Sequence, residues 1–418
     1  MSSIKLKHSG GNGVIISAPD TNPASDKTIK LPSTESGVFA TKDSANSLQN
    51  VTGINGGQLG NRNLIINGAM QVAQRGTSST EFGYKTVDRI YGGYANTDEA
   101  PTFTQADIGT SDAPYLLGFR KSFKIQNGNQ TSGAGAADEL FMTYNIEAQD
   151  LAQSGWDYTS SSSNITISFW VKSSVAQQFQ VNMRLYPASG DQKEFCFEYT
   201  PSANTWTKVT KTISGAAGNV LRNTNELGMF IQFPQFYGAN YTANTRAFDT
   251  WETKNNAQNY KDYATTWYTT NDATFEITGL QLEVGSVATD FEHRSFGDEL
   301  ARCQRYYYLH AGYAMAGNTG NVVVTDYGTQ YTSSVVFTSF KHPVEMRTKP
   351  SMHCSTVSNG FMKYAAGSNA AFNSFVLDGI TSRANAAVNV SISGTAGHAV
   401  MLRTNDVSGA FLAFSAEL

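Results

Sequence analysis

The sequence predicts an all-β protein of tandem antiparallel β-sandwiches that resemble jelly rolls, and three observations lead to this prediction. Apolar and polar residues alternate along most of the chain after Asn61, as in strands with one buried and one wet face. Strand-like segments recur every 10–20 residues or so, with no helical periodicity between most of them. Charged residues make up only 15% of the 418 residues, and hydroxyl and amide side chains take their place, which suits a β-rich surface.

Residues 1–60 are expected to form a β-stranded attachment segment followed by a linker. Three short alternating stretches, "SIKLKHS", "GVIISAP" and "KTIKLPS", are separated by turns rich in Gly, Pro, Asn and Asp. Each offers only one to three apolar residues, which are Ile4, Leu6, Val14, Ile16, Ile29 and Leu31. Because so few apolar residues bury too little area, the segment cannot fold alone. It needs copies of itself or another protein as a partner.

Residues 61–296 are predicted to form the first sandwich, which has the character of a carbohydrate-binding module. In "NITISFWVKSS", one face carries Ile165, Ile167, Phe169 and Val171. In "ATFEITGLQLEVG", the alternation of inward-facing apolar residues skips one step at Thr278–Gly279. A β-bulge there would restore the register.

A short connector helix and a second sandwich are predicted for the remainder, residues 297–418. The stretch "SFGDELARCQRYYYLH" has cap candidates in Ser295 and Asp298 and basic residues toward its end. Alternating segments then resume up to "GAFLAFSAEL".

Charge and composition argue against several classes of partner and cofactor. The net charge of −4 comes without a basic stripe, so we expect no nucleic-acid partner. No apolar run approaches the roughly 20 residues of a membrane helix, and the start lacks a secretory signal, so we expect neither membrane insertion nor export by that route. Three widely spaced cysteines and six isolated histidines predict neither a disulfide framework nor a metal site, and no cofactor-binding motif occurs.

One long stretch, residues 234–272, lacks periodicity and is crowded with aromatic residues. Long loops in compact domains are usually functional, and aromatic rings stack on the C–H faces of sugars. The candidates for carbohydrate contact are Tyr237, Tyr241, Trp251, Tyr260, Tyr263 and Trp267. The alternative is that these rings hold the loop against its own sandwich or against a neighbouring subunit.

Catalysis is not expected. A glycan-cleaving enzyme needs two suitably spaced carboxylates, one with a raised pKa. The scattered candidates, which the sequence cannot pair, are Asp88, Asp249, Glu252, Asp262, Asp272 and Glu283.

Several motifs together resemble bacteriophage tail fibres and receptor-binding proteins of the type found in marine and cyanobacterial phages. These are "GGQLGNRNLIINGAMQVAQRGTS", "KTVDRI", "NITISFWVKSS" and, most specifically, "TGLQLEVGSVATDFEHRSFGDELARCQRYYY". The resemblance spans nearly the whole chain. It implies a homotrimer, docking on other tail or adaptor proteins through residues 1–60, and a place in the virion after synthesis in the host cytoplasm. It also makes the second sandwich, residues 297–418, a candidate receptor-binding head.

Three functions follow as hypotheses. The leading one is a tail fibre that binds polysaccharide or lipopolysaccharide of the host surface without cleaving it. The second is a purely structural fibre, adaptor or decoration protein of the virion. The third is a polysaccharide depolymerase, although the chain shows none of the short repeats of a parallel β-helix.

Overall fold

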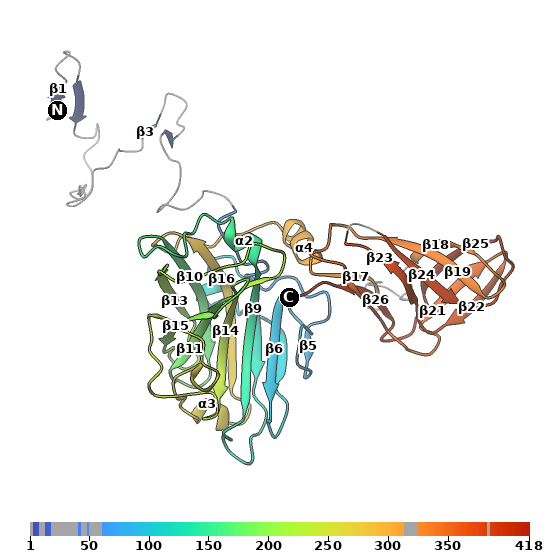
Figure 1. The fold of residues 1–418 in the computed structure, drawn as a ribbon, viewed down its shortest axis with the longest axis horizontal. Coiled ribbons are helices and arrows are strands. Elements are labelled where there is room, and N and C mark those ends of the chain that lie inside the picture. The colour runs from blue at the N-terminus through green and yellow to red at the C-terminus, as the bar shows by residue number, and fades with distance from the viewer. Residues whose placement is uncertain are drawn as a thin grey trace. The chain divides into compact units, whose positions relative to one another are not determined.

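The computed structural model describes residues 61–312, 324–382 and 385–418, together with the backbone of four short strands near the N-terminus (Figure 1). The chain divides into two compact units, Met1–Thr52 and Gly53–Leu418.

The N-terminal unit contains two pairs of antiparallel strands. Strand β1 (Ser3–Lys7) pairs with β2 (Gly13–Ser17), and β3 (Thr41–Lys42) pairs with β4 (Leu48–Gln49). The first pair coincides with the two leading stretches predicted from the sequence. The third predicted stretch, around Ile29, lies outside the described residues.

Two six-stranded sheets form the first sandwich. Sheet 1 has the order β13-β10-β16-β8-β7-β5 and sheet 2 the order β15-β12-β11-β14-β9-β6, with every named pair antiparallel. The strands of sheet 1 are β5 (Ser78–Ser79), β7 (Thr102–Asp107), β8 (Lys121–Gln126), β10 (Asn164–Ser173), β13 (Thr207–Ser214) and β16 (Thr274–Val284). Those of sheet 2 are β6 (Ile90–Ala95), β9 (Glu139–Glu147), β11 (Phe179–Leu185), β12 (Lys193–Tyr199), β14 (Leu227–Tyr237) and β15 (Trp251–Thr253).

Short helical turns lie in the connections of this sandwich. They are α1 (Ala113–Leu116), α2 (Ala148–Ala152), the 3₁₀ turn η1 (Asn256–Gln258) and α3 (Thr266–Thr269).

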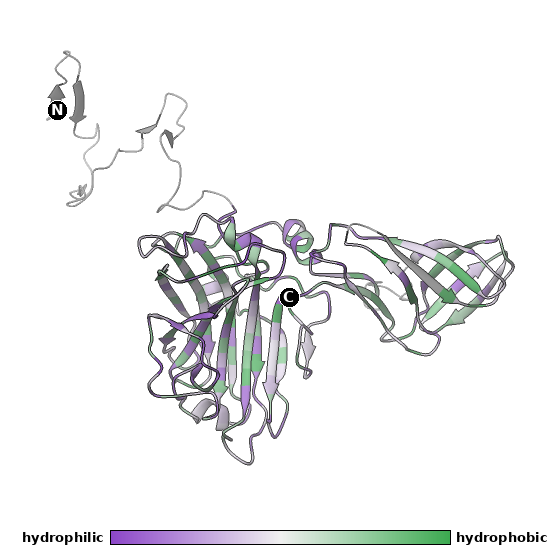
Figure 2. Cartoon of the chain, in the orientation of Figure 1, coloured by the Kyte–Doolittle hydropathy of each residue, from purple (hydrophilic) through white to green (hydrophobic). Residues whose placement is uncertain are grey.

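The core between sheets 1 and 2 follows the predicted alternation. The four inward residues predicted in β10, beginning with Ile165, have no exposed surface. Met183 of β11 and Ile231 of β14 meet them from the opposite sheet. Figure 2 shows hydrophilic and hydrophobic residues alternating along these strands. Since burial of one strand face excludes water from apolar surface, this alternation is the main source of the sandwich's stability.

The predicted β-bulge in β16 is confirmed. Ser168 of β10 faces Gln281, and Trp170 faces Thr278, so Gly279 and Leu280 together oppose one residue of β10. The backbone of Gly279 has a φ of +62°, which favours glycine.

The second sandwich is also all-β. Sheet 3 has the order β17-β26-β20, and sheet 4 the order β22-β21-β25-β18-β19-β24-β23. The strands are β17 (Tyr307–Gly312), β18 (Val324–Gln330), β19 (Val335–Lys341), β20 (Ser351–Cys354), β21 (Phe361–Ala365), β22 (Ser368–Phe372), β23 (Val376–Ile380), β24 (Asn385–Ser391), β25 (Ala399–Thr404) and β26 (Phe411–Ser415).

The predicted connector helix precedes this sandwich as α4 (Phe296–Gln304). The Ser295 hydroxyl accepts a hydrogen bond from the amide of Asp298, so Ser295 is the N-cap. Cys303 of α4 packs with Ile66, Val72 and Tyr306 in a small separate core.

Candidate functional site

Sheet 2 carries an open pocket of about 350 Å³ on the face turned away from the core, called the sheet pocket below. The alternation of inward and outward residues along β14 shows this orientation. Met229, Ile231 and Phe233 belong to the core, whereas the intervening Phe230 and Gln232 line the pocket. The residues that the sheet-2 strands contribute are Glu139, Thr143 and Asn145 from β9, Arg184 from β11, and Leu227, Phe230, Gln232 and Tyr237 from β14.

The remaining wall comes from Tyr186, just after β11, and from the aromatic loop, defined here as residues 238–273. The loop residues that line the pocket are Tyr241, Lys254, Asn256, Asn259 and Tyr260. Backbone hydrogen bonds hold the loop over sheet 2: the amide of Asp249 donates to the carbonyl of Cys196 in β12, at 2.8 Å. Lys254 likewise donates its amide to Gln192, at 2.9 Å. The loop is therefore a fixed wall of the pocket.

Three of the six predicted contact residues meet in this pocket: Tyr237, Tyr241 and Tyr260. The ring of Tyr237 stacks with two others, with its centroid 4.6 Å from that of Tyr260 and 5.7 Å from that of Phe141. Phe141 in turn stacks on Tyr91 of β6. Tyr237 is buried, with 7% of its surface exposed, so it offers little surface to a sugar.

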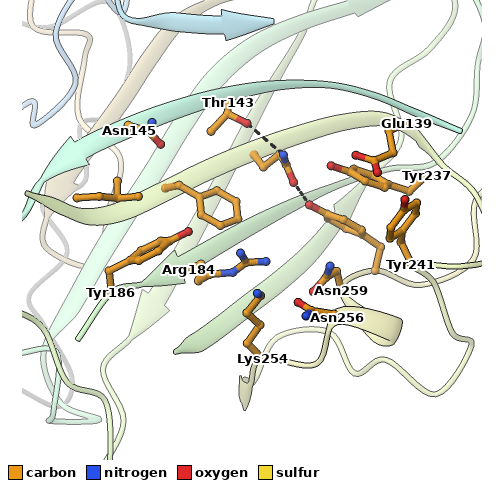
Figure 3. A pocket seen from close by; sticks show the side chains of 14 residues that line it. Glu139, Thr143, Asn145, Arg184, Tyr186, Tyr237, Tyr241, Lys254, Asn256 and Asn259 are labelled. Carbon is orange, nitrogen blue, oxygen red and sulfur yellow. Dashed lines mark hydrogen bonds between the residues drawn. The ribbon is translucent and has the colours of Figure 1, made fainter. Parts of the chain in front are cut away.

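Hydrogen bonds fix the tyrosines at the inner wall of the pocket. The Tyr260 hydroxyl donates to Gln232, whose side-chain amide donates to the Thr143 hydroxyl at 3.1 Å (Figure 3). Burial raises the pKa of Tyr260 well above its usual value, so the hydroxyl stays protonated.

The other three predicted residues lie outside the pocket and pack against the sandwich. Trp267 has no exposed surface, and its indole N–H donates to the carbonyl of Thr274 at 3.1 Å. Trp251 is half-buried against the core and donates its indole N–H to the carbonyl of Ser214 at 2.8 Å. Tyr263 packs against the same core. These rings hold the loop in place, which is the alternative the sequence left open.

Two half-exposed rings frame the pocket instead. Tyr186 and Tyr241 lie on opposite sides of it in Figure 3, with the polar side chains between them. Sequence reasoning missed Tyr186 because it follows a regular strand and lies far from the aromatic loop in the sequence. The signal was its position two residues after Arg184, on the face of this strand that alternates with the apolar Met183 and Leu185.

Charges are distributed unevenly around the pocket. Arg184 Nε lies 2.5 Å from an oxygen of the buried Glu194, and its guanidinium lies over the ring of Phe230. Lys254 lies beside Arg184 in Figure 3, while Glu139 and Tyr241 lie together at the other side. A hydrogen bond to Glu139 raises the pKa of Tyr241.

Among the described residues that line the pocket, Glu139 carries the one carboxylate. The six acids considered from the sequence lie elsewhere, each held by its own hydrogen bonds or ion pair: Asp88, Asp249, Glu252, Asp262, Asp272 and Glu283.

The described part of the chain contains no group of three or more His, Cys, Asp or Glu side chains arranged to hold a metal ion. Within that same part, no helix has the length and apolarity needed to cross a membrane.

No model of a protein family matches this sequence, and a search of curated proteins finds no match. Among solved structures, the enzymatically active domain of tailspike protein 4 from bacteriophage CBA120 is 11% identical, with a TM-score of 0.29. The match covers 53% of this chain and 21% of the tailspike chain, about a fifth of its length.

Two carbohydrate-binding modules match the chain at a similar level. A family 11 module from Clostridium thermocellum, in complex with a β-1,3-1,4-mixed-linked tetrasaccharide, is 10% identical over 51% of this chain and 98% of its own, with a TM-score of 0.26. A xylan-binding domain from Paenibacillus barcinonensis is 10% identical over 52% of this chain and 97% of its own, with a TM-score of 0.23.

Proposed function

We propose that the protein binds a glycan in the sheet pocket without cleaving it, and that it does so as a phage tail fibre at the host surface. The observation that carries the proposal is the pair of half-exposed rings, Tyr186 and Tyr241, on opposite sides of a polar pocket (Figure 3). Sugar rings bind proteins through aromatic faces combined with hydrogen bonds to their hydroxyls. The sheet pocket offers both.

Polar atoms in the pocket wall support recognition of hydroxyl groups. The exposed Asn256 lines the pocket, and its side-chain oxygen is an acceptor for a ligand hydroxyl. The carboxylate of Glu139 is a second acceptor on the same side as Tyr241 (Figure 3).

The number of carboxylates that line the pocket supports binding without hydrolysis. Glycosidases of the common type place two carboxylates on either side of the scissile bond, about 5–10 Å apart. Glu139 has no second carboxylate among the described lining residues. A depolymerase is therefore the weaker hypothesis for this site.

The attachment role draws its support from the resemblance of the sequence to phage tail fibres. In this role residues 1–60 join the protein to other tail or adaptor proteins, and three chains form the fibre. A shallow pocket of weak affinity suffices in such an assembly, because several linked copies raise avidity by roughly 10²–10⁴.

A second location for receptor binding is favoured by one observation in the second sandwich. Tyr327 of β18 and Tyr331, which follows this strand, are 69% and 64% exposed, respectively. Tyr331 also packs against Phe337 of β19, with ring centroids 4.8 Å apart. This exposed aromatic group is compatible with a receptor-binding head.

The proposal is tested by applying the full-length protein to an array of bacterial capsular and lipopolysaccharide glycans. We expect binding that is lost in Tyr186→Ala and Tyr241→Ala but kept in Tyr331→Ala, without release of reducing ends. Loss of binding in Tyr331→Ala alone would assign recognition to the second sandwich. If the protein bound none of the glycans on the array, the proposed function would be overturned. Release of reducing ends would identify a depolymerase.

A further inference from the structure

We propose that the ligand of the sheet pocket is an anionic glycan whose acidic substituent binds at Lys254 and Arg184. This inference rests on the proposed function and adds the chemical class of the ligand.

The first observation is the ammonium group of Lys254. It lines the pocket, and within the described residues it has neither an ion pair nor a side-chain hydrogen bond. Its backbone is fixed by the bond from its amide to the carbonyl of Gln192, so the lysine side chain extends from a fixed point of this wall. Burial, and then the neighbouring Arg184, lower the pKa of Lys254, while the carboxylate of Glu194 acts in the opposite direction.

The second observation is that the carboxylates behind the pocket are already engaged. Buried Glu194 pairs with Arg184 and also lies 3.6 Å from Arg246. Arg246 is held in addition by Glu252, at 2.8 Å. Two arginines and two glutamates thus balance one another. The charge of Lys254 remains as the local excess.

The third observation concerns the free side of Arg184. Its Nε and Nη2 both contact the same oxygen of Glu194, whereas Nη1 makes no hydrogen bond to the described residues. Arg184 and Lys254 lie beside each other in Figure 3. An anion between them would gain charge-assisted hydrogen bonds from both groups.

The negative end of the pocket fixes the orientation of such a ligand. Glu139 lies across the pocket from Lys254, beside Tyr241 (Figure 3). Its carboxylate would repel an anionic group and accept hydrogen bonds from neutral hydroxyls. The acidic substituent therefore points toward Lys254, and the neutral part of the glycan lies between the two tyrosines.

A carboxylate of a sugar acid and a phosphate substituent share this chemistry, and the experiment separates them. Each glycan bound on the array is compared by calorimetry with its carboxyl-reduced form and with its dephosphorylated form. We expect one of the two treatments to weaken binding about tenfold or more, since a charge-assisted contact is lost. The treatment that weakens binding identifies the acidic group.

Two lysine variants of the full-length protein complete the test. Lys254→Met is expected to weaken binding of the acidic glycan about tenfold and to leave binding of its neutralised form unchanged. Lys261→Met is the matched control, because this lysine belongs to the same loop but contacts Phe248 outside the pocket. Equal affinity for the acidic and neutralised forms, or unchanged binding in Lys254→Met, would overturn the inference while leaving glycan binding intact. Absence of binding to every glycan would instead overturn the proposed function.

Discussion

Two aromatic residues of the same loop, Tyr241 and Trp267, differ in role because only one of them retains exposed surface. Trp267 is fully buried and packs edge-to-face against Phe179. Tyr241 is half-exposed at the pocket and contacts Tyr237 only through a perpendicular ring contact. Aromatic density alone does not distinguish an anchor from a contact residue, whereas exposed surface does.

We therefore expect Trp267→Ala and Tyr241→Ala to have opposite profiles. Trp267→Ala should lower the free energy of unfolding by about 3–5 kcal/mol, because it leaves a large cavity. Tyr241→Ala should change it by less than about 1 kcal/mol while abolishing glycan binding. Denaturant titration and the glycan array measure the two effects. A stable Trp267→Ala protein would show that the loop is not anchored by this residue.

Asp88 provides a pH-dependent contribution to stability. It is 1% exposed, and burial raises its pKa to about 6 although Arg75 Nη1 lies 3.6 Å away. The folded protein therefore binds a proton that the unfolded chain releases at lower pH. The stability from this group is fully present below the ordinary aspartate pKa of about 3.9, and it is lost as the pH rises through 6.

Comparison with Asp88→Asn isolates this effect. The difference between the folded and ordinary pKa values corresponds to about 3 kcal/mol. We expect the unfolding free energy of the wild type, relative to Asp88→Asn, to fall by nearly that amount between pH 3 and pH 7. Denaturant titrations at several pH values measure it, and parallel pH profiles of the two proteins would contradict it.

At the scale of elements, β16 shows how one residue keeps a long strand in register with two neighbours. The bulge at Gly279 returns Leu280 and Leu282 to the core after Phe275 and Ile277. The amide of Leu280 also donates to the carbonyl of Gly68, at 2.9 Å. The segment that follows Asn61 is thereby tied to the last strand of the sandwich.

Gly279→Ala should lower the free energy of unfolding by about 2 kcal/mol or more. An added Cβ would lie 2.8 Å from the Phe119 ring, at a φ that already strains any other residue. Gly190→Ala is the control, because Gly190 has a φ of +89° but no atom within 4 Å of an added Cβ. A smaller loss for Gly190→Ala, measured by thermal and denaturant unfolding, separates crowding from backbone strain. Equal losses would attribute the whole effect to strain.

At the scale of the whole molecule, a buried ionic cluster joins the first sandwich to the last residues of the chain. Glu417 pairs with the buried Arg89 and, at 3.1 Å, with Arg75. The Arg89 guanidinium also lies 3.5 Å from the ring centroid of Tyr306. Glu147 of β9 binds Arg305 at 2.7 Å, just after α4.

Glu417→Ala should lower the free energy of unfolding by about 3–5 kcal/mol, because it leaves Arg89 buried without its carboxylate. The control is Glu226→Ala, which removes an exposed pair with Arg222 and should cost no more than about 1 kcal/mol. The double variant Arg89→Met/Glu417→Met is expected to recover much of the loss. Similar small losses for both single variants would contradict a structural role of the cluster.

This cluster makes the first sandwich depend on residues near the end of the chain. A chain ending near His293 would lack Glu417, Cys303 and Tyr306. Arg89 would lose its carboxylate, and Ile66 would lose its apolar cover. Recognition by the first sandwich is therefore tested with point variants of the full chain.

The sequence by itself determined the all-β architecture, the inward residues of the long strands and the bulge at Gly279, and it limited the helix cap to Ser295 or Asp298. These features depend on residues close together in the chain, because period-two burial, glycine geometry and capping are local effects.

Only the tertiary structure decided which side chains share the sheet pocket and which of them keep exposed surface. Glu139, Arg184 and Lys254 come from separate strands and loops and meet through the order of strands in sheet 2. Tyr237 and Trp267 looked alike in the sequence, yet Tyr237 reaches the pocket and Trp267 does not. The physical reason is that antiparallel pairing joins residues far apart in sequence, and burial depends on what the rest of the chain places over each side chain.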